Sequence, residues 1–221
     1  MKHFIWFGFA IWFFATFTAC TKTETVAPAP ETKTVVSTAT QTVVNPDPTS
    51  CRSGVWCYDY LVRPRITKAL LEADVSPICK THSVDKNQIW LAVERGISLA
   101  ESDWKYETTY EEDFIDEATG KLSISTGLFQ LSYGDRNNYR NTECDLITKD
   151  NLKDPVVNVK CAMAIQNKLL TTDKRDVLSV VGRYWSVMRP TVYIKKLKKT
   201  IPNARHQVFL AEFHKNAPGC K

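Results

Sequence analysis

The sequence predicts a mainly α-helical domain that is stapled by disulfides, and three observations lead to this fold class. Apolar residues recur with helical spacing in several segments between residues 64 and 215, whereas no sustained strand-like alternation is seen. Six cysteines follow the first fifty residues. Hydrophobic residues make up 43% of the 221-residue chain, which is enough to form the core of one good-sized domain.

The first twenty residues have the pattern of an export signal. Lys2 precedes the apolar stretch FIWFGFAIWFFATF, which is too short for a comfortable membrane span, and the next charge is Lys22. Residues 17–20 (Phe-Thr-Ala-Cys) are similar to a bacterial lipobox with Phe17 in place of the usual leucine, so we expect lipidation at Cys20. An ordinary cleaved signal or a retained anchor is the alternative. Each interpretation predicts an exported protein: a periplasmic or outer-membrane-anchored lipoprotein, or a secreted one.

Residues 21–50 are rich in Thr, Val, Ala and Pro without helical period, which predicts an extended, poorly ordered tether. The folded domain is expected over residues 51–221. In an exported domain, six cysteines indicate three disulfides, for which fifteen pairings are possible; the cysteines are Cys51, Cys57, Cys79, Cys144, Cys161 and Cys220. Because there is no CxxC pair and no histidine at ligand spacing, we expect neither a metal nor a cofactor.

The net charge of +5 is a modest excess that suits an acidic polymer or an anionic surface. A basic cluster at Lys195, Lys196, Lys198 and Lys199 is interpreted as a solvated helix face, or as a contact with such a polymer or with a membrane surface. Nucleic acid is not expected as a partner of an exported protein.

Two helices are predicted in the first part of the domain, at residues 64–73 and from Asp85 to Glu101. Pro64 suits the first turn of the former, and Asp85 with Gln88 forms a capping box for the latter. Successive steps of 100° place four side chains on one face of the second helix: Trp90, Glu94, Ile97 and Glu101.

Residues 101–117 are strongly acidic and contain interleaved aromatic residues, which indicates either a solvated surface or a wall that faces a substrate. The segment ATGKL at 118–122 is typical of a turn, so we expect a small β-hairpin or irregular insertion here.

The second half of the domain is again helical in pattern. Asp154 and Pro155 start a helix over VVNVKCAMAIQNKLL, and residues 176–188 have the spacing of a strongly amphipathic helix. Two further helices are predicted at 191–199 and 204–215.

Three motifs occur in a fixed order: Ala100-Glu101-Ser102 at the end of an apolar helix, GLFQL at 127–131, and Asn158-Val159 in the helix after Pro155. Tyr184 then follows. This order resembles the soluble lytic transglycosylases and goose-type lysozymes of the lysozyme-like superfamily. Two departures stand out, because Trp185 replaces the family's asparagine after the tyrosine and the gap between Glu101 and the GLFQL segment is long.

The resemblance implies a lysozyme-like fold in which the insertion lies beside an active-site cleft and Glu101 is the catalytic acid. Such an acid must stay protonated near neutral pH, and partial burial raises the pKa of a glutamate. Glu94 is the rival acid, and its other interpretation is a buried ion-pair or capping partner. The resemblance also implies substrate binding by Gln130 and Tyr184, with turn capping and core packing as their alternatives, while Ser125 is a candidate for the family's substrate-binding serine.

The implied reaction is cleavage of the MurNAc-β-1,4-GlcNAc bond of peptidoglycan, in which a lytic transglycosylase uses one glutamate and forms a 1,6-anhydro product. A lysozyme needs a second carboxylate. The acidic run offers Glu107, Glu111, Glu112, Asp113 and Asp116, among which Glu112 is our candidate. We favour the transglycosylase slightly over the lysozyme, and a non-catalytic peptidoglycan-binding protein is the third hypothesis. Expected partners are glycan strands and, through the lipid anchor, a membrane; the protein is expected to be a monomer.

Overall fold

The computed structural model describes residues 51–81, 83–116, 120–194 and 197–220. The expected signal peptide, the lipidation at Cys20 and the tether at 21–50 lie outside these residues, as do Lys195 and Lys196 of the basic cluster. Within the described ranges, no helix has the length and apolar character needed to cross a membrane.

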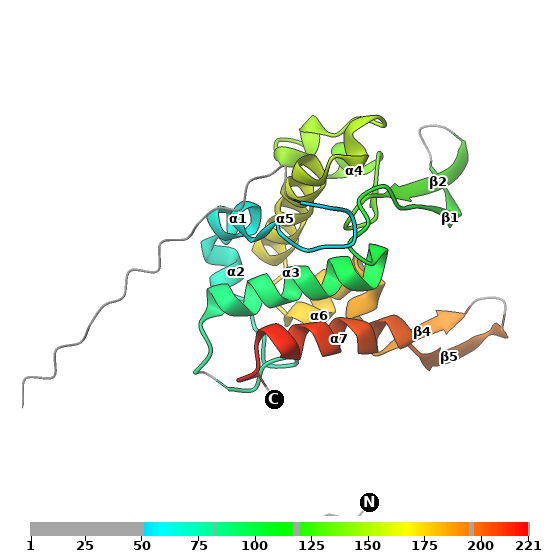
Figure 1. Cartoon of the computed structure of the whole chain (residues 1–221). Helices are drawn as coiled ribbons and strands as arrows, with labels where there is room; N and C mark the ends of the chain where they lie inside the picture. Colours follow the sequence, from blue (N-terminus) through cyan, green and yellow to red (C-terminus); the bar gives the residue numbers. More distant parts are fainter. Residues whose placement is uncertain (1–50, 82, 117–119, 195–196, 221) are drawn as a thin grey trace, which may run out of the picture. The chain divides into compact units, whose positions relative to one another are not determined.

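Helical segments dominate the domain, as predicted (Figure 1). The α-helices are α1 Asp59–Val62, α2 Lys68–Glu72, α3 Lys86–Ser102, α4 Asp135–Asn138, α5 Pro155–Thr172, α6 Val177–Val180 and α7 Ala204–Asn216. The 3-10 helices are η2 Arg63–Arg65, η3 Glu143–Leu146, η4 Asn151–Lys153, η5 Val181–Arg183 and η6 Ser186–Met188. The strands are β1 Thr109–Asp116, β2 Lys121–Thr126, β3 Leu131–Ser132, β4 Thr191–Ile194 and β5 Lys199–Pro202. The mainly α fold is therefore confirmed.

Helix α3 is the centre of the core and is buried on nearly all sides, with α7 beside it (Figure 1). The two helices approach closely at Gly96, where an added Cβ would lie 2.8 Å from the ring of Phe209. Asp85 caps α3 by accepting from the backbone N–H of Asn87. Gln88 does not complete the expected capping box, because its Nε2 donates to the carbonyl of Asn216, 2.7 Å away at the end of α7. This bond ties the start of α3 to the end of α7.

Three disulfides link all six cysteines of the domain, as predicted. The pairs are Cys51–Cys57, Cys79–Cys220 and Cys144–Cys161. Disulfides persist in oxidising compartments, so this usage fits an exported protein.

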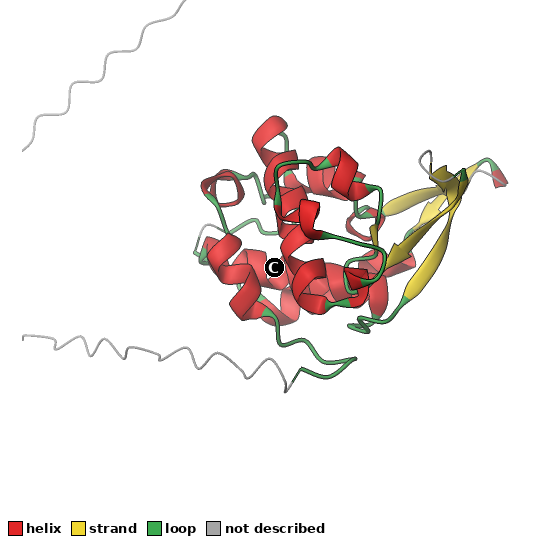
Figure 2. Cartoon of the chain, turned by 90° about the horizontal axis from the view of Figure 1, so that it is seen from above, coloured by secondary structure: helices red, strands yellow, loops and turns green. Residues whose placement is uncertain are grey.

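The expected hairpin is present and belongs to a three-stranded antiparallel sheet in the order β1-β2-β3. Tyr110 pairs with Ser125 and Glu111 with Ile124, and the register shifts between Glu111 and Ile115. In Figure 2, seen at right angles to Figure 1, the strands lie at one side of the helices. One side of β2 packs inward through the buried Ser123 and Ser125.

Two predicted helices were wrong. Residues 176–188 are broken into α6, η5 and η6, because Trp185 leaves the helical conformation (φ −95°, ψ 99°) and its indole bonds the backbone of another segment. The second predicted helix is replaced by strands: residues 191–194 form β4 and Lys199 begins β5, and Val192 pairs with Ile201. The run TVYI is rich in β-branched and aromatic residues, which suit a strand. The first predicted helix, at 64–73, is likewise divided between η2 and α2.

Candidate active site

Glu101 lies in the last turn of α3, and its side chain is only 11% exposed. Burial raises its pKa to about 7, because desolvation penalises the charged carboxylate. Two charged neighbours act on it in opposite directions: the cation of Arg205 lowers the pKa and the carboxylate of Glu112 raises it. Glu101 is thus the weakly exposed, easily protonated carboxyl that the sequence predicted.

The chain reverses direction directly after this carboxyl. Asp103 and Trp104 both have a φ of 56°, a left-handed conformation that is unfavourable for residues other than glycine. The indole Nε1 of Trp104 donates to the carbonyl of Arg95, 3.1 Å away, and holds the reversed chain against α3. The acidic run therefore returns past the end of the helix as strand β1.

The reversal brings Glu112 of β1 into the electrostatic neighbourhood of Glu101. Ser125 of β2 donates from its Oγ to Glu112 Oε1 at 2.5 Å and fixes the orientation of this carboxylate. Other acids of the run are placed differently: Glu107 accepts from the hydroxyl of Ser53, and Glu111 lies opposite Ile124. Among the acids proposed for the second carboxylate, Glu112 is the one whose charge acts on the pKa of Glu101.

The segment 127–131 forms a tight turn that is attached to the end of α3. Ser102 Oγ donates to the carbonyl of Leu128 at 2.9 Å. Gln130, at a φ of 49°, donates from Nε2 to the carbonyls of Thr108 (3.1 Å) and Gly127 (2.8 Å). Both amide hydrogens of Gln130 thus serve the backbone of its own turn and of the approach to β1, the alternative role considered for it. Its binding to a sugar stays a prediction.

Asn158 of α5 is fully buried and is hydrogen-bonded to the same turn. Its Oδ1 accepts from the N–H of Phe129, and its Nδ2 donates to the carbonyls of Thr126 and Leu152, each at 2.9 Å. Gly127 is required beside it, because its φ is +84° and an added Cβ would lie 2.4 Å from Asn158 Nδ2. The three sequence motifs therefore meet through hydrogen bonds.

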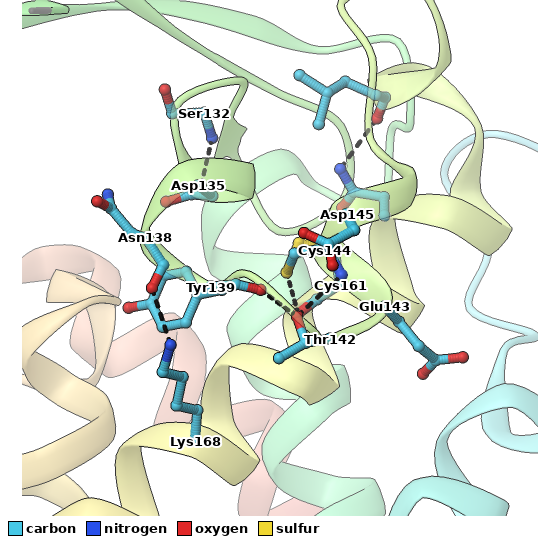
Figure 3. Close-up of a disulfide and its surroundings, with 12 residues drawn as sticks. Ser132, Asp135, Asn138, Tyr139, Thr142, Glu143, Cys144, Asp145, Cys161 and Lys168 are labelled. Atoms are coloured by element: carbon cyan, nitrogen blue, oxygen red, sulfur yellow. Dashed lines mark hydrogen bonds between the residues drawn. A yellow bond between two sulfur atoms is a disulfide. The ribbon is translucent and has the colours of Figure 1, made fainter.

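Tyr184 and Trp185 reach the site from the segment that follows α6. Trp185 Nε1 donates to the carbonyl of Phe129 at 2.9 Å, so Trp185 also holds the turn in place. The hydroxyl of Tyr184 donates to Asp135. Asp135 also accepts from the N–H of Ser132 at 2.8 Å (Figure 3). Burial raises the pKa of Asp135 to about 6 and that of Tyr184 well above its usual value.

The Cys144–Cys161 disulfide lies near the Asp135 network. Figure 3 shows the Cys144–Cys161 disulfide in the same region as Asp135, close to Tyr139 and Thr142. The hydroxyl of Thr142 donates to the carbonyl of Tyr139 at 2.5 Å. Substrate binding by Tyr184 stays a prediction, since the contact seen for its hydroxyl is with Asp135.

Glu94, the rival acid, is completely buried and lies two turns before Glu101 on α3. Its partner is the neutral amide of Gln166, whose Nε2 donates to Glu94 Oε2 at 2.9 Å. The expectation of an ion pair or a cap was therefore wrong. Enclosed burial raises its pKa to about 8.

Glu94 makes stability depend on pH. Because its folded-state pKa lies above the ordinary value of 4.5, the unfolded state releases the proton first, and the contribution of Glu94 to stability falls as pH rises from about 4.5 to about 8. In Glu94→Gln, the amide oxygen still accepts from Gln166, so thermal unfolding should show a smaller decrease in Tm between pH 5 and pH 8 than the wild type does. Glu72→Gln, an exposed control, should leave this decrease unchanged; an unchanged decrease in Glu94→Gln contradicts the assignment.

Two residues of the site have no counterpart in the sequence motifs. The first is Arg205, in the first turn of α7, whose Nη1 lies 3.6 Å from Glu101 Oε2. The second is Asp135, which accepts a hydrogen bond from the hydroxyl of Tyr184. Both are brought in from distant parts of the chain, and neither has a local pattern that would have indicated its role.

An open groove of about 480 Å³ lies elsewhere, between η2, η3 and α5. Its lining includes Arg65, Glu143 and Lys168 but neither Glu101 nor Glu112, so we locate the candidate site by its paired carboxylates rather than by concavity. The described ranges contain no cluster of three His, Cys, Asp or Glu side chains with the placement of metal ligands.

No protein-family model and no curated protein matches the chain significantly. Solved structures of Bd0314 DslA are similar to it. The wild-type form 2 is 25% identical with a TM-score of 0.58, and the match covers 74% of this chain and 91% of that one. Two glutamate-to-glutamine mutants of the same protein are 24% identical with TM-scores of 0.59 and 0.58, over the same shares. The chain is thus similar to Bd0314 DslA in fold.

Proposed function

We propose that the protein is a lysozyme-like glycosidase that hydrolyses the MurNAc-β-1,4-GlcNAc bond of peptidoglycan, with Glu101 as general acid and Glu112 as the second carboxylate. The observation that carries this proposal is a pair of glutamates: Glu101 is 11% exposed at the end of α3, and Glu112, which Ser125 holds by a hydrogen bond, raises the pKa of Glu101. The ordered motifs around Glu101, Gly127 and Asn158 support the substrate class through their resemblance to enzymes that act on peptidoglycan.

Glu101 has the properties that protonation of a leaving group demands. With a pKa of about 7, a large share of its carboxyls carry the proton at neutral pH, and they can deliver it to the glycosidic oxygen. The bonds from Ser102 and Trp104 to the surrounding backbone hold the end of α3, so that the carboxyl is presented in one place.

Glu112 favours hydrolysis over anhydro formation. A hydrolase needs a carboxylate that activates water or stabilises the positive charge developing on the sugar, and the hydroxyl of Ser125 keeps Glu112 oriented for such a task. A lytic transglycosylase manages with one glutamate, so it gives no role to a second acid held beside Glu101. The role of Ser125 in this proposal is therefore to position Glu112.

A spacing of glutamates in Bd0314 DslA supports the choice of this pair. In Bd0314 DslA, two glutamates that lie 11 residues apart were each replaced by glutamine. Glu101 and Glu112 lie 11 residues apart as well. The equal spacing of the two glutamates in both proteins supports the choice of Glu112 among the acids of residues 101–117.

The sequence features outside the described residues complete the proposal. The export signal and Cys20 favour a lipoprotein anchored in the periplasm or at the outer membrane, with residues 21–50 as a tether that lets the domain reach glycan strands. The three disulfides agree with that location. We propose that it acts as a monomer.

Digestion of purified sacculi, followed by mass spectrometry of the products, tests the reaction. Hydrolysis yields reducible muramic acid ends, whereas anhydro-muramic ends would identify a lytic transglycosylase and reject the role of Glu112 in activating water. Binding to sacculi without any released product would instead favour a non-catalytic peptidoglycan-binding protein.

Replacing Glu112 by glutamine should lower the rate of hydrolysis about 100-fold, because the neutral amide neither activates water nor stabilises positive charge. Glu111→Gln is the matched control, since the neighbouring strand residue pairs with Ile124 instead. Initial rates of release of reducing ends measure both. Equal activity of the two variants would remove Glu112 from the mechanism.

A further inference from the structure

Arg205 has an unusual relation to the candidate acid. Its side chain is 59% exposed, and Nη1 lies 3.6 Å from Glu101 Oε2, beyond ordinary hydrogen-bond range. In the described part of the chain, no other carboxylate lies within ion-pair distance of it. A guanidinium carries five N–H donors, so most of the hydrogen-bonding capacity of Arg205 faces solvent.

The position of Arg205 follows from the packing of α7 on α3. The two helices run side by side in opposite directions, so the first turn of α7 lies at the Glu101 end of α3 (Figure 1). Asn203 caps this turn by accepting from the N–H of Arg205 itself, at 3.1 Å. The base of the side chain is therefore held, while its long flexible part projects into solvent next to the acid.

The charge of Arg205 opposes the protonation of Glu101 without abolishing it, since the pKa of Glu101 is still about 7. A general acid must be protonated, but the charge of Arg205 favours the carboxylate form of Glu101 and lowers its pKa. Glu112, the other charged group that acts on Glu101, has the opposite effect. A ligand that draws Arg205 away from Glu101 would remove the cation that lowers the pKa of Glu101. The carboxylate of Glu112 would still raise that pKa.

We propose that Arg205 binds a carboxylate of the glycan substrate next to the bond that Glu101 cleaves, and that it leaves Glu101 when it does so. The inference rests on the proposed glycosidase function and adds a specificity-determining residue to it. Arginine suits the task, since its planar fork matches a carboxylate with two parallel hydrogen bonds. Peptide-free muramic acid supplies such a group in its lactyl carboxylate. Where a peptide is attached, that carboxyl is an amide, and the carboxylates of the peptide take its place.

The test compares three oligosaccharides of equal length: a peptide-free glycan with lactyl carboxylates, the same glycan with its peptides, and neutral chitin oligosaccharide. In Arg205→Ala, the ratio of kcat/KM on a carboxylate-bearing glycan to that on chitin should fall about 10- to 100-fold, the range of a charge-assisted hydrogen bond. Arg205→Lys, which keeps the charge without the fork, should recover part of the ratio. If the ratio of kcat/KM falls only for the peptide-bearing glycan, the peptide is the source of the carboxylate.

The pH profile separates this role from a merely structural one. The kcat/KM on chitin depends on protonated Glu101 in the free enzyme and falls as pH rises through its pKa. Because the cation no longer lowers that pKa in Arg205→Ala, the fall should move to higher pH. Arg175→Ala is the control, since Arg175 is similarly exposed and pairs with Asp173; its ratio and profile should equal those of the wild type.

Equal losses on charged and neutral substrates, or an unmoved pH profile, would overturn the inference while leaving the glycosidase proposal intact. If the wild type cleaves none of the three, the proposed function fails, and calorimetric binding of the same oligosaccharides decides the role of Arg205. Weaker binding of the carboxylate-bearing glycans alone in Arg205→Ala then supports it, and equal weakening of all three rejects it.

Discussion

Glu101→Gln should lower the rate of peptidoglycan cleavage about 1000-fold, the central part of the range that general acid catalysis contributes. Glutamine has nearly the same shape, so the contacts of the helix end stay in place, but it has no proton to give to the leaving oxygen. The measurement is the initial rate of release of new glycan ends from purified sacculi.

Exposed Glu72 offers the matched control, since Glu72→Gln makes the same chemical change at a surface position that pairs with Lys68. It should retain wild-type activity. Thermal unfolding of Glu101→Gln should give a Tm at least equal to that of the wild type at neutral pH, because the substitution removes a buried ionisable group. Activity that survives in Glu101→Gln would reject this residue as the acid and with it the proposed mechanism.

Asn158→Ala should lower the free energy of unfolding by about 4 kcal/mol, a large part of the stability of an ordinary domain. The substitution leaves three buried backbone groups without their partner: the N–H of Phe129 and the carbonyls of Thr126 and Leu152. Each unpaired group costs about 1–3 kcal/mol, and the space left beside Gly127 adds a cavity.

Urea unfolding followed by tryptophan fluorescence measures this loss. Asn137→Ala, at an exposed position of α4, is the control and should change stability by less than about 0.5 kcal/mol. A loss below about 1 kcal/mol in Asn158→Ala would show that the clamp on the turn is not what stabilises it.

The sequence was informative where the physical cause is local. Asp85 and the pair Asp154-Pro155 begin helices because a side-chain oxygen or a fixed φ satisfies the first turn, and the structure shows these starts. The position of Glu101 at the end of an apolar helix was likewise readable from spacing alone. The disulfides were predicted in number, whereas their pairing needed the fold.

Prediction failed where neighbours distant in sequence decide the conformation. The periodic segment around Trp185 breaks because its indole bonds the carbonyl of Phe129, and the run TVYI becomes a strand because Ile201 and its neighbours pair with it. A short apolar segment suits a helix and a strand about equally, so only its partner determines which one forms.

The sequence by itself determined a disulfide-linked, mainly helical domain with a glutamate at the end of its central helix, because burial patterns, caps and cysteines are local properties of the chain. Only the tertiary structure decided that Glu112 and Arg205 act on that glutamate. The electrostatic interaction between charges depends on their separation in space, and the left-handed turn at Asp103 and the packing of α7 on α3 set that separation.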